Sequence, residues 1–442
     1  MTRRRCAPAL LLAMGMASCA SQEHHPAATG PARVPMGAAA RPEEVGLDLS
    51  RSTDPATLLR AAATRNPKLR ALRAQWRAAI EEIPQETALP DPMFSTGPEF
   101  DDAQGLDEWV FEVSQEIPFP TKLELKGRLA DREARIAHLR YLAAVRDELV
   151  ELQEALQEMA YLDRAIELVP RVRELFERYA AFAAGELQSG RTKLPETFRA
   201  EAQLAQLDYD LVRLRELRET EAERIRTIAG LPPGTPLGPA VPPAFRAVEL
   251  DLEALVTLAQ GHNEELRIAG VEVDRAGLEV ELARQSRVPD FDVSLRHEYA
   301  ARTANEDETM AMLGITLPVW EGKNRARVEE AQAREEAARA REDDGARRLR
   351  NDVTKIYYRL TNAGRLVELY RDRLVPEATE AVAAAEELFR TGQASFAAAV
   401  ETATTWYAFQ LAYHRAVSDH GQAVARLEQV LGTALPRREG QP

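Results

Sequence analysis

The chain has 442 residues, a formal net charge of −14 and only 6% aromatic residues. The acidic balance argues against a nucleic-acid binder, which needs basic groups to neutralise phosphates. No run of about 20 uncharged apolar residues follows the N-terminus, which excludes a membrane-spanning helix. A content of 45% hydrophobic and 29% charged residues with few aromatics is typical of long packed helices.

The N-terminus has the pattern of a secretory signal. Three arginines at positions 3–5 precede a short apolar run, residues 7–16, too short for a membrane span. Met16-Ala17-Ser18-Cys19 then resembles the lipobox of bacterial lipoproteins. The resemblance implies a lipid on Cys19 and, because Ala20 follows rather than aspartate, sorting to the outer membrane. The alternative is an ordinary signal peptide cut elsewhere.

Both cysteines lie within the first nineteen residues, so every residue after Cys19 lacks a thiol. The mature chain then has no disulfide, cysteine metal site or thiol nucleophile. Residues 19–53 are rich in alanine, proline and glycine without apolar periodicity, which predicts an extended tether. The pair His24-His25 within it is interpreted as solvent-exposed rather than as a metal site.

The remaining sequence is duplicated with an offset near 200 residues, and a repeat decides the architecture before any other signal. Pro118 and Pro318 each end an alternating apolar and polar run and begin a long charged segment. Each copy is predicted to run helix, two strands, very long helix, turn, helix. The other matching pairs are Asn66 with Asn263, Pro90-Asp91 with Pro289-Asp290, Gly190 with Gly392, and Ala229-Gly230 with Leu431-Gly432.

The duplication divides the chain into six segments. They are a signal peptide at 1–18, the tether at 19–53, a first repeat at 54–230, a Pro/Gly linker at 231–250, a second repeat at 251–435 and a tail at 436–442.

The first helix of the first repeat is predicted to begin with Asp54 as N-cap and Pro55 at the first helical position. Pro84 and Pro90 weaken and then end it. Its apolar stripe comprises Leu58, Leu59, Leu69, Leu72, Trp76 and Ile80.

Two strand pairs follow, at 92–100 and 108–117 and at 290–299 and 308–317. Apolar and polar residues alternate along them with the period of a strand, which predicts one apolar and one polar face. A lipid-exposed, water-filled barrel needs such faces; the alternative is a soluble sheet packed on helices. Four strands cannot close a barrel, and an open sheet edge cannot sit in lipid, so several chains would have to combine. The residues expected to face the membrane are Trp109, Phe111, Val113, Phe291, Val293 and Leu295.

Each strand pair is followed by a helix of about 67 residues, predicted at 122–188 and 323–389, far beyond the average length of about 11–12. Pro170 and Pro376 should each kink its helix or break its hydrogen-bond ladder. A coiled-coil seam with alternating spacings of four and three runs along the second helix. It comprises Leu349, Val353, Ile356, Leu360, Ala363, Val367, Tyr370 and Leu374.

Glycine-containing reversals end both long helices, because glycine supplies the left-handed C-cap. Return helices are expected at 195–229 and 395–431. The reversals comprise Ser189, Gly190 and Arg191 in the first repeat and Thr391, Gly392 and Gln393 in the second.

The duplication, the two strand pairs, the two long helices and the glycine turns together resemble the TolC-type outer membrane factor family, over residues 54–435. The lipobox and the helix start at Pro118-Phe119-Pro120-Thr121-Lys122 resemble in particular the lipidated heavy-metal and drug efflux branch of that family. The resemblance implies a mostly α-helical fold with a small β part. It also implies a homotrimer in which four strands per chain form a twelve-stranded β-barrel, continued across the periplasm by a long α-barrel.

The resemblance also implies roles for the helix turns and for two acidic residues that follow them. The turns at Gly190 and Gly392 would meet a periplasmic adaptor protein, which joins an inner-membrane transporter. Glu196 and Glu401 fall at suitable offsets to line a closed periplasmic gate. The alternatives are structural: each turn glycine would only cap its helix, and each glutamate would only be a solvated carboxylate.

The leading functional hypothesis is a passive outer-membrane exit duct of a tripartite efflux pump, carrying drugs or metal cations from the periplasm to the exterior. The alternatives are the outer-membrane component of a type I secretion system and a periplasmic coiled-coil adaptor or scaffold lipoprotein. The sequence contains no GxSxG, HExxH, P-loop or GxGxxG pattern, so we expect no catalytic site, resident metal or cofactor.

Overall fold

The computed structural model describes residues 53, 55–101, 105–188, 194–240, 245, 251–300 and 308–435. The chain divides into two units, 1–46 and 47–442, and all described residues belong to the second. The signal peptide, Cys19 and most of the tether therefore lie outside the described residues. The elements in chain order are α1 (Pro55–Arg65), α2 (Pro67–Thr87), β1 (Met93–Asp101), β2 (Gly105–Ile117), α3 (Pro120–Gln188), α4 (Leu194–Ala229), α5 (Leu252–His262), α6 (Glu264–Gln285), β3 (Phe291–Ala300), β4 (Glu308–Ile315), α7 (Glu321–Leu369), η1 (Tyr370–Leu374), α8 (Val375–Arg390) and α9 (Phe396–Leu431).

The mostly helical fold and its duplicated element order are confirmed, with one difference at the start of each repeat. The single helix expected first is two helices, broken at Asn66 in the first copy and at Asn263 in the second. The Asn66 side chain accepts hydrogen bonds from the backbone N–H groups of Lys68 and Leu69, and Pro67 begins the new helix. The sequence predicted one continuous helix through Asn66, but this residue is instead the N-cap of a second helix.

Each break is closed by the end of the return helix of the same repeat. Asn66 Nδ2 donates to the carbonyl of Ile228 at 3.0 Å, and Asn263 Nδ2 donates to the carbonyl of Val430 at 2.9 Å. Gly230 and Gly432 follow these carbonyls with φ of 64° and 72°. A Cβ on Gly432 would lie 2.3 Å from the carbonyl oxygen of His262, so only glycine fits there.

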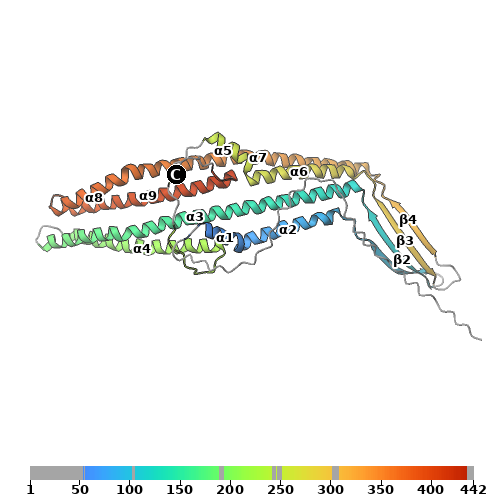
Figure 1. The fold of residues 1–442 in the computed structure, drawn as a ribbon, viewed down its shortest axis with the longest axis horizontal. Helices are drawn as coiled ribbons and strands as arrows, with labels where there is room; N and C mark the ends of the chain where they lie inside the picture. Colours follow the sequence, from blue (N-terminus) through green and yellow to red (C-terminus); the bar gives the residue numbers. More distant parts are fainter. Residues whose placement is uncertain are drawn as a thin grey trace, which may run out of the picture. The chain divides into compact units, whose positions relative to one another are not determined.

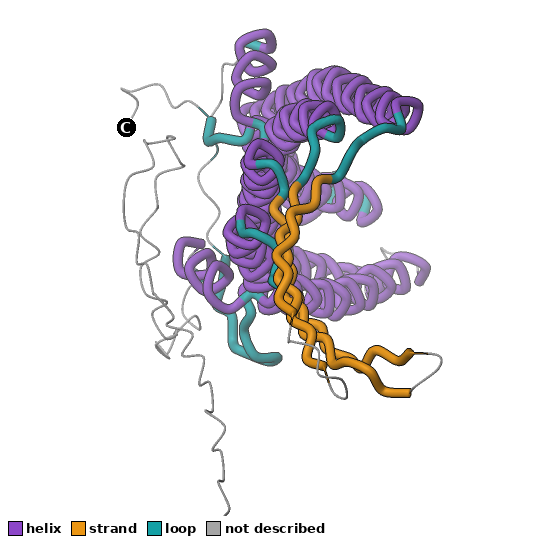
Figure 2. Tube along the Cα trace, turned by 90° about the vertical axis from the view of Figure 1, so that its right-hand side faces the viewer, coloured by secondary structure: helices purple, strands orange, loops and turns teal. Residues whose placement is uncertain are grey.

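The two hairpins merge into one antiparallel sheet in the order β1-β2-β3-β4 (Figure 1). The central pairing joins the repeats, because β2 of the first copy pairs with β3 of the second. Trp109 lies opposite Tyr299, and Ile117 lies opposite Phe291. Figure 2 shows the four strands as a twisted ribbon beside the helix ends.

α3 is the central helix of the fold, since it packs against α2 and α4 of its own repeat and against α6 and α9 of the other. Pro170 lies inside α3, and the helix is continuous through this proline over its full length of 69 residues. Its neighbours Val169 and Val172 are fully buried, so packing holds the helix across the missing hydrogen bond.

The second long helix is interrupted where the sequence predicted a broken ladder. α7 ends at Leu369, the five-residue π-helix η1 follows, and Pro376 lies in the first turn of α8. The predicted seam along α7 is buried at Leu349, Val353 and Leu360, which form one core cluster with α5 and α9.

The described part of the Pro/Gly linker is a packed strap rather than a free connection. Leu231, Leu237 and Ala240 belong to a core cluster with Leu58 and residues of α3 and α4. Thr53 forms a parallel bridge with Ala240, and its hydroxyl donates to the carbonyl of Gly238 at 2.7 Å. The linker therefore holds the start of the first repeat in place.

Candidate functional site: the amphipathic sheet and the helix turn

The sheet presents an apolar face that no described residue covers. Trp109, Phe111 and Val113 on β2 retain 40–42% of their surface, and Val293 and Leu295 on β3 retain 43% and 53%. Such a band is unusual on a soluble protein, where exposed apolar patches mark interaction sites. Phe291, the sixth residue expected on this face, lies opposite Ile117 and is half-buried.

The opposite face of the same strands is charged. Arg296 donates to Glu99 at 3.0 Å, forms an ion pair with Glu298 at 2.7 Å, and lies opposite Glu112 in the ladder. Four residues further along β2, nearer the helices, Glu116 lies opposite Asp292. The predicted alternation thus holds across β2 and β3, and each face can meet a different solvent.

The outer strands of the sheet are open on one side. β1 pairs only with β2 and β4 only with β3 among the described strands, which leaves one ladder of backbone groups unpaired on each. An open edge recruits another strand, and it cannot be exposed to hydrocarbon. The sheet is therefore incomplete as a membrane element in a single copy.

A clasp of ionic and backbone contacts holds the sheet to the first long helix. The Asp290 carboxylate, just before β3, accepts from the backbone N–H of Phe119 at 2.8 Å and from Lys122 Nζ at 2.7 Å. Lys122 Nζ also donates to the carbonyl of Val288 at 2.8 Å. Burial opposes ionisation, but these donors outweigh it and lower the pKa of Asp290.

The turn between α8 and α9 is described in the second repeat. Gly392 has φ of 74° and its N–H donates to the carbonyl of Phe389, while Gln393 N–H donates to Leu388 at 2.8 Å. Thr391, Gly392 and Gln393 are all exposed, and an added Cβ on Gly392 would meet nothing within 4 Å. The turn is thus a hydrogen-bonded cap with an exposed outer surface.

The predicted gate and the first turn can be followed only in part. Ser189, Gly190 and Arg191 lie outside the described residues, as does the side chain of Glu196. Glu401 lies on α9, exposed, nine residues beyond Gly392. Because the Glu196 side chain lies outside the described part, the structure does not test how the two carboxylates are arranged, and their gate role stays a prediction.

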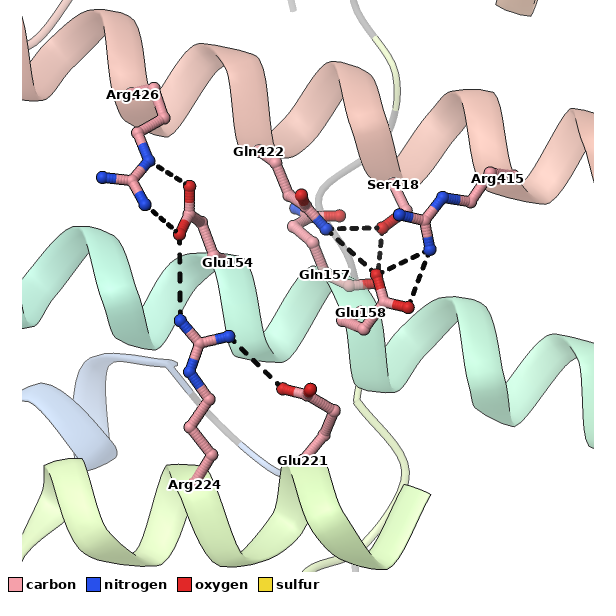
Figure 3. Close-up of polar contacts among 9 residues, drawn as sticks. All are labelled: Glu154, Gln157, Glu158, Glu221, Arg224, Arg415, Ser418, Gln422 and Arg426. Atoms are coloured by element: carbon pink, nitrogen blue, oxygen red, sulfur yellow. Dashed lines mark hydrogen bonds and ion pairs between the residues drawn. The ribbon is translucent and has the colours of Figure 1, made fainter. Parts of the chain in front are cut away.

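Sequence reasoning missed a polar seam between α3 and α9, where the two repeats meet (Figure 3). Glu158 accepts from Arg415 Nη1 with both oxygens at 2.7 and 2.8 Å, and from Gln422 at 3.2 Å. Glu154 accepts from Arg426 Nη2 at 2.7 Å, and Arg224 of α4 approaches it to 3.9 Å. Glu154 thus links three helices.

Small residues of α9 allow this close approach. Ser418 Oγ donates to the carbonyl of Gln157 at 3.0 Å, and a Cβ on Gly421 would lie 2.5 Å from the Gln157 amide carbon. A serine and a glycine three residues apart in the return helix were a sequence signal of tight packing.

In the described part of the chain, no group of three or more acidic, histidine or cysteine residues is arranged to hold a metal ion. No described helix is long and apolar enough to cross a membrane.

Comparison with known proteins gives a family match in the second repeat and a fold match over most of the chain. Residues 255–433 match the family model described as outer membrane efflux protein. The comparison with curated proteins gives no match.

Solved structures of outer membrane proteins share the fold. VceC of Vibrio cholerae is 17% identical with a TM-score of 0.74, over 86% of this chain and 96% of that one. The open MtrE channel of Neisseria gonorrhoeae is 16% identical with a TM-score of 0.73, over 88% and 91%. The CmeC channel of Campylobacter jejuni is 13% identical with a TM-score of 0.70, over 87% of each chain. The second repeat thus matches the outer membrane efflux protein family model, and most of the chain shares the fold of solved outer membrane channels.

Proposed function

We propose that this protein is the outer-membrane exit duct of a tripartite efflux pump. It passes small solutes, drugs or metal cations, passively from the periplasm to the exterior. The observation that carries the proposal is the exposed apolar face of the sheet, with a charged face behind it and an open edge on either side. A sheet with these properties fits a barrel wall between lipid and water.

The proposed assembly is a homotrimer. Three copies supply twelve strands, and each open β1 edge receives the β4 edge of a neighbouring copy. Closure satisfies the unpaired backbone groups that hydrocarbon would not tolerate. The long helices continue the barrel away from the membrane into the periplasm, and Cys19 carries a lipid that holds the chain to the outer membrane.

The far helix turns are the proposed contact with a periplasmic adaptor, which in turn contacts an inner-membrane transporter that supplies the energy. The exposed backbone around Thr391, Gly392 and Gln393 supports this, because a capped tip presents a defined surface at little cost in ordering. Ser189, Gly190 and Arg191 are the proposed equivalent in the first repeat. Glu196 and Glu401 are proposed to line the closed aperture near these tips.

The test combines electrical measurement with a cell assay. Purified protein added to planar lipid bilayers should give discrete conductance steps, and a deletion strain should become sensitive to drugs or to metal cations. The alternative of a coiled-coil scaffold predicts no conductance, and a secretion role predicts loss of an exported polypeptide with unchanged sensitivity. Protein that stays monomeric and soluble without detergent would contradict the proposed function.

A further inference from the structure

The Asp290 clasp joins the second repeat to the first within one chain. Asp290 lies just before β3, and its carboxylate accepts two hydrogen bonds from the start of α3. The donors are the backbone N–H of Phe119 and the ammonium group of Lys122. The contact is well protected, since the Lys122 and Asp290 side chains retain only 14% and 24% of their surface. It fixes the first long helix to the sheet exactly where the two copies of the repeat meet.

Every part of this clasp has a counterpart one repeat away. Asp91 follows Pro90 as Asp290 follows Pro289, and Lys323 is the third residue of α7 as Lys122 is the third residue of α3. Trp320 precedes α7 as Phe119 precedes α3. The counterparts belong to the two outer strands of the sheet, however, so they cannot meet within a single chain.

The counterparts are also unsatisfied in the chain. Asp91 and Lys323 are exposed, and neither side chain has a hydrogen bond or ion pair with any described residue. Trp320 is 73% exposed and caps α7 with no side-chain hydrogen bond at that helix end. A helix N-terminus without a cap leaves backbone N–H groups and a partial positive charge free for a carboxylate.

We propose that Asp91 of one copy clasps Lys323 and the Trp320 N–H of a neighbouring copy, repeating between chains the contact that Asp290 makes within the chain. The inference deepens the proposed function, because it rests on the trimer and assigns residues to its interface. Repeats arranged around one ring face equivalent neighbours, so an intrachain junction and an interchain junction share one geometry.

The strand register agrees with the clasp. Ile117 pairs with Phe291 in the chain, and the repeat offsets of 200 and 199 residues place Leu317 opposite Pro92 of a neighbouring copy. Two pairs further along the strands, Ile315 then faces the partner's Phe94. Phe94 and Ile315 retain 62% and 52% of their surface and both lie on the apolar face, so this register keeps the two side chains on the same side of the sheet.

The charged side chains on α2 and α7 also support contact with a second copy of this chain at the outer edge. Arg70, Arg73 and Arg77 form an exposed stripe on α2 without an ion pair among the described residues. Glu336 and Asp343 on α7 are exposed and likewise unpaired within the described chain. The equivalent helices α6 and α3 pack inside the chain and exchange ion pairs such as Arg275 with Glu133, at 2.6 Å. Complementary stripes at the outer junction fit a second copy of this chain.

The test uses cysteine pairs and a short bis-maleimide in the full chain. Cys6→Ser and Cys19→Ser are added so that the introduced cysteines carry the only thiols. Asp91→Cys with Lys323→Cys should give covalent dimers and trimers on a denaturing gel. The matched control, Asp290→Cys with Lys122→Cys, should react within the chain and run as a monomer. Mixing chains that carry Asp91→Cys alone with chains that carry Lys323→Cys alone should give dimers.

A charge exchange provides the second measurement. Asp91→Lys should strongly reduce the heat-resistant trimer band, and adding Lys323→Asp in the same chain should restore it. A protein that is trimeric by mass measurement, yet gives only monomer bands with the 91/323 pair and no rescue by exchange, would overturn the clasp and leave the proposed function standing. A protein with no trimer at all would overturn both.

Discussion

At the scale of single residues, the sequence showed which positions correspond between the repeats but not what they do. Asn66 and Asn263 were recognisable as a pair. Asn66 precedes Pro67 in the same cap-and-proline pattern that predicted a helix start at Asp54-Pro55, so the first break was open to prediction and was missed. Asn263 has no proline after it, and its cap was not distinguishable from a helix residue. Gly230 and Gly432 were visible as a pair as well. Their need for glycine comes from contacts with residues far away in the chain, and no local pattern records such contacts.

Replacing Gly432 with alanine should destabilise the protein by about 2–5 kcal/mol. The left-handed φ costs about 1–2 kcal/mol for a side chain, and the new Cβ would meet the His262 carbonyl, which adds about 1–3 kcal/mol of overpacking. Thermal unfolding in detergent, followed by circular dichroism, measures the change. Gly234→Ala is the control, since its φ is 75° but nothing lies within 4 Å, so it should cost only the first part. Equal losses for the two variants would show that the close approach is unimportant.

At the scale of elements, length and period predicted the long helices, the strands and the buried seam of α7. The two prolines then behaved differently: α3 runs through Pro170, while η1 precedes Pro376. Both prolines follow Leu-Val, yet the outcomes differ, because the surrounding helices decide whether a missing hydrogen bond is tolerated. The α3–α9 seam was not predicted, because ionic residues on long helices are usually solvated and only their partners' positions reveal a buried contact.

Replacing Glu154 with glutamine should weaken the α3–α9 seam. The change keeps the shape but removes the charge that Arg426 and Arg224 approach, and a hydrogen bond to a charged group contributes about 1.5–3 kcal/mol. Glu387→Gln is the matched control, because its pair with Arg390 is exposed and solvent screens such a pair, so its loss should have little effect on stability. Denaturant unfolding of both variants compares them, and an equal effect would mean that the seam is no stronger than a surface pair.

At the scale of the whole molecule, the sequence predicted a two-faced sheet of four strands, and the structure has it. The merging of the hairpins into one sheet followed from neither repeat alone, since it depends on β2 meeting β3. Among the described residues, the apolar face of the sheet and its two edges, β1 and β4, have no partners. The sheet therefore fits an apolar environment and neighbouring strands from other chains.

A charge on the apolar face should therefore prevent insertion into the membrane. Phe111→Lys places an ammonium group where lipid is expected, at about 2–4 kcal/mol per copy near the middle of the bilayer. Val110→Lys, one residue earlier, faces the other side and lies opposite Glu298, so it should be tolerated. The fraction of protein recovered as heat-resistant trimer from membranes measures both, and a similar loss for the two variants would argue against a lipid-facing surface.

The bonds that close each repeat also set an order of events during synthesis. Asn66 reaches a carbonyl 162 positions later, and Asn263 reaches one 167 positions later. Contacts between residues so far apart in the sequence form slowly, because the chain loses the entropy of closing a long loop before the contact can stabilise it. The first half can form its closing bond once residues up to Ile228 have been exported, whereas the second half must wait for Val430. Under the proposed function, a chaperone on the periplasmic side would therefore meet a half-closed chain.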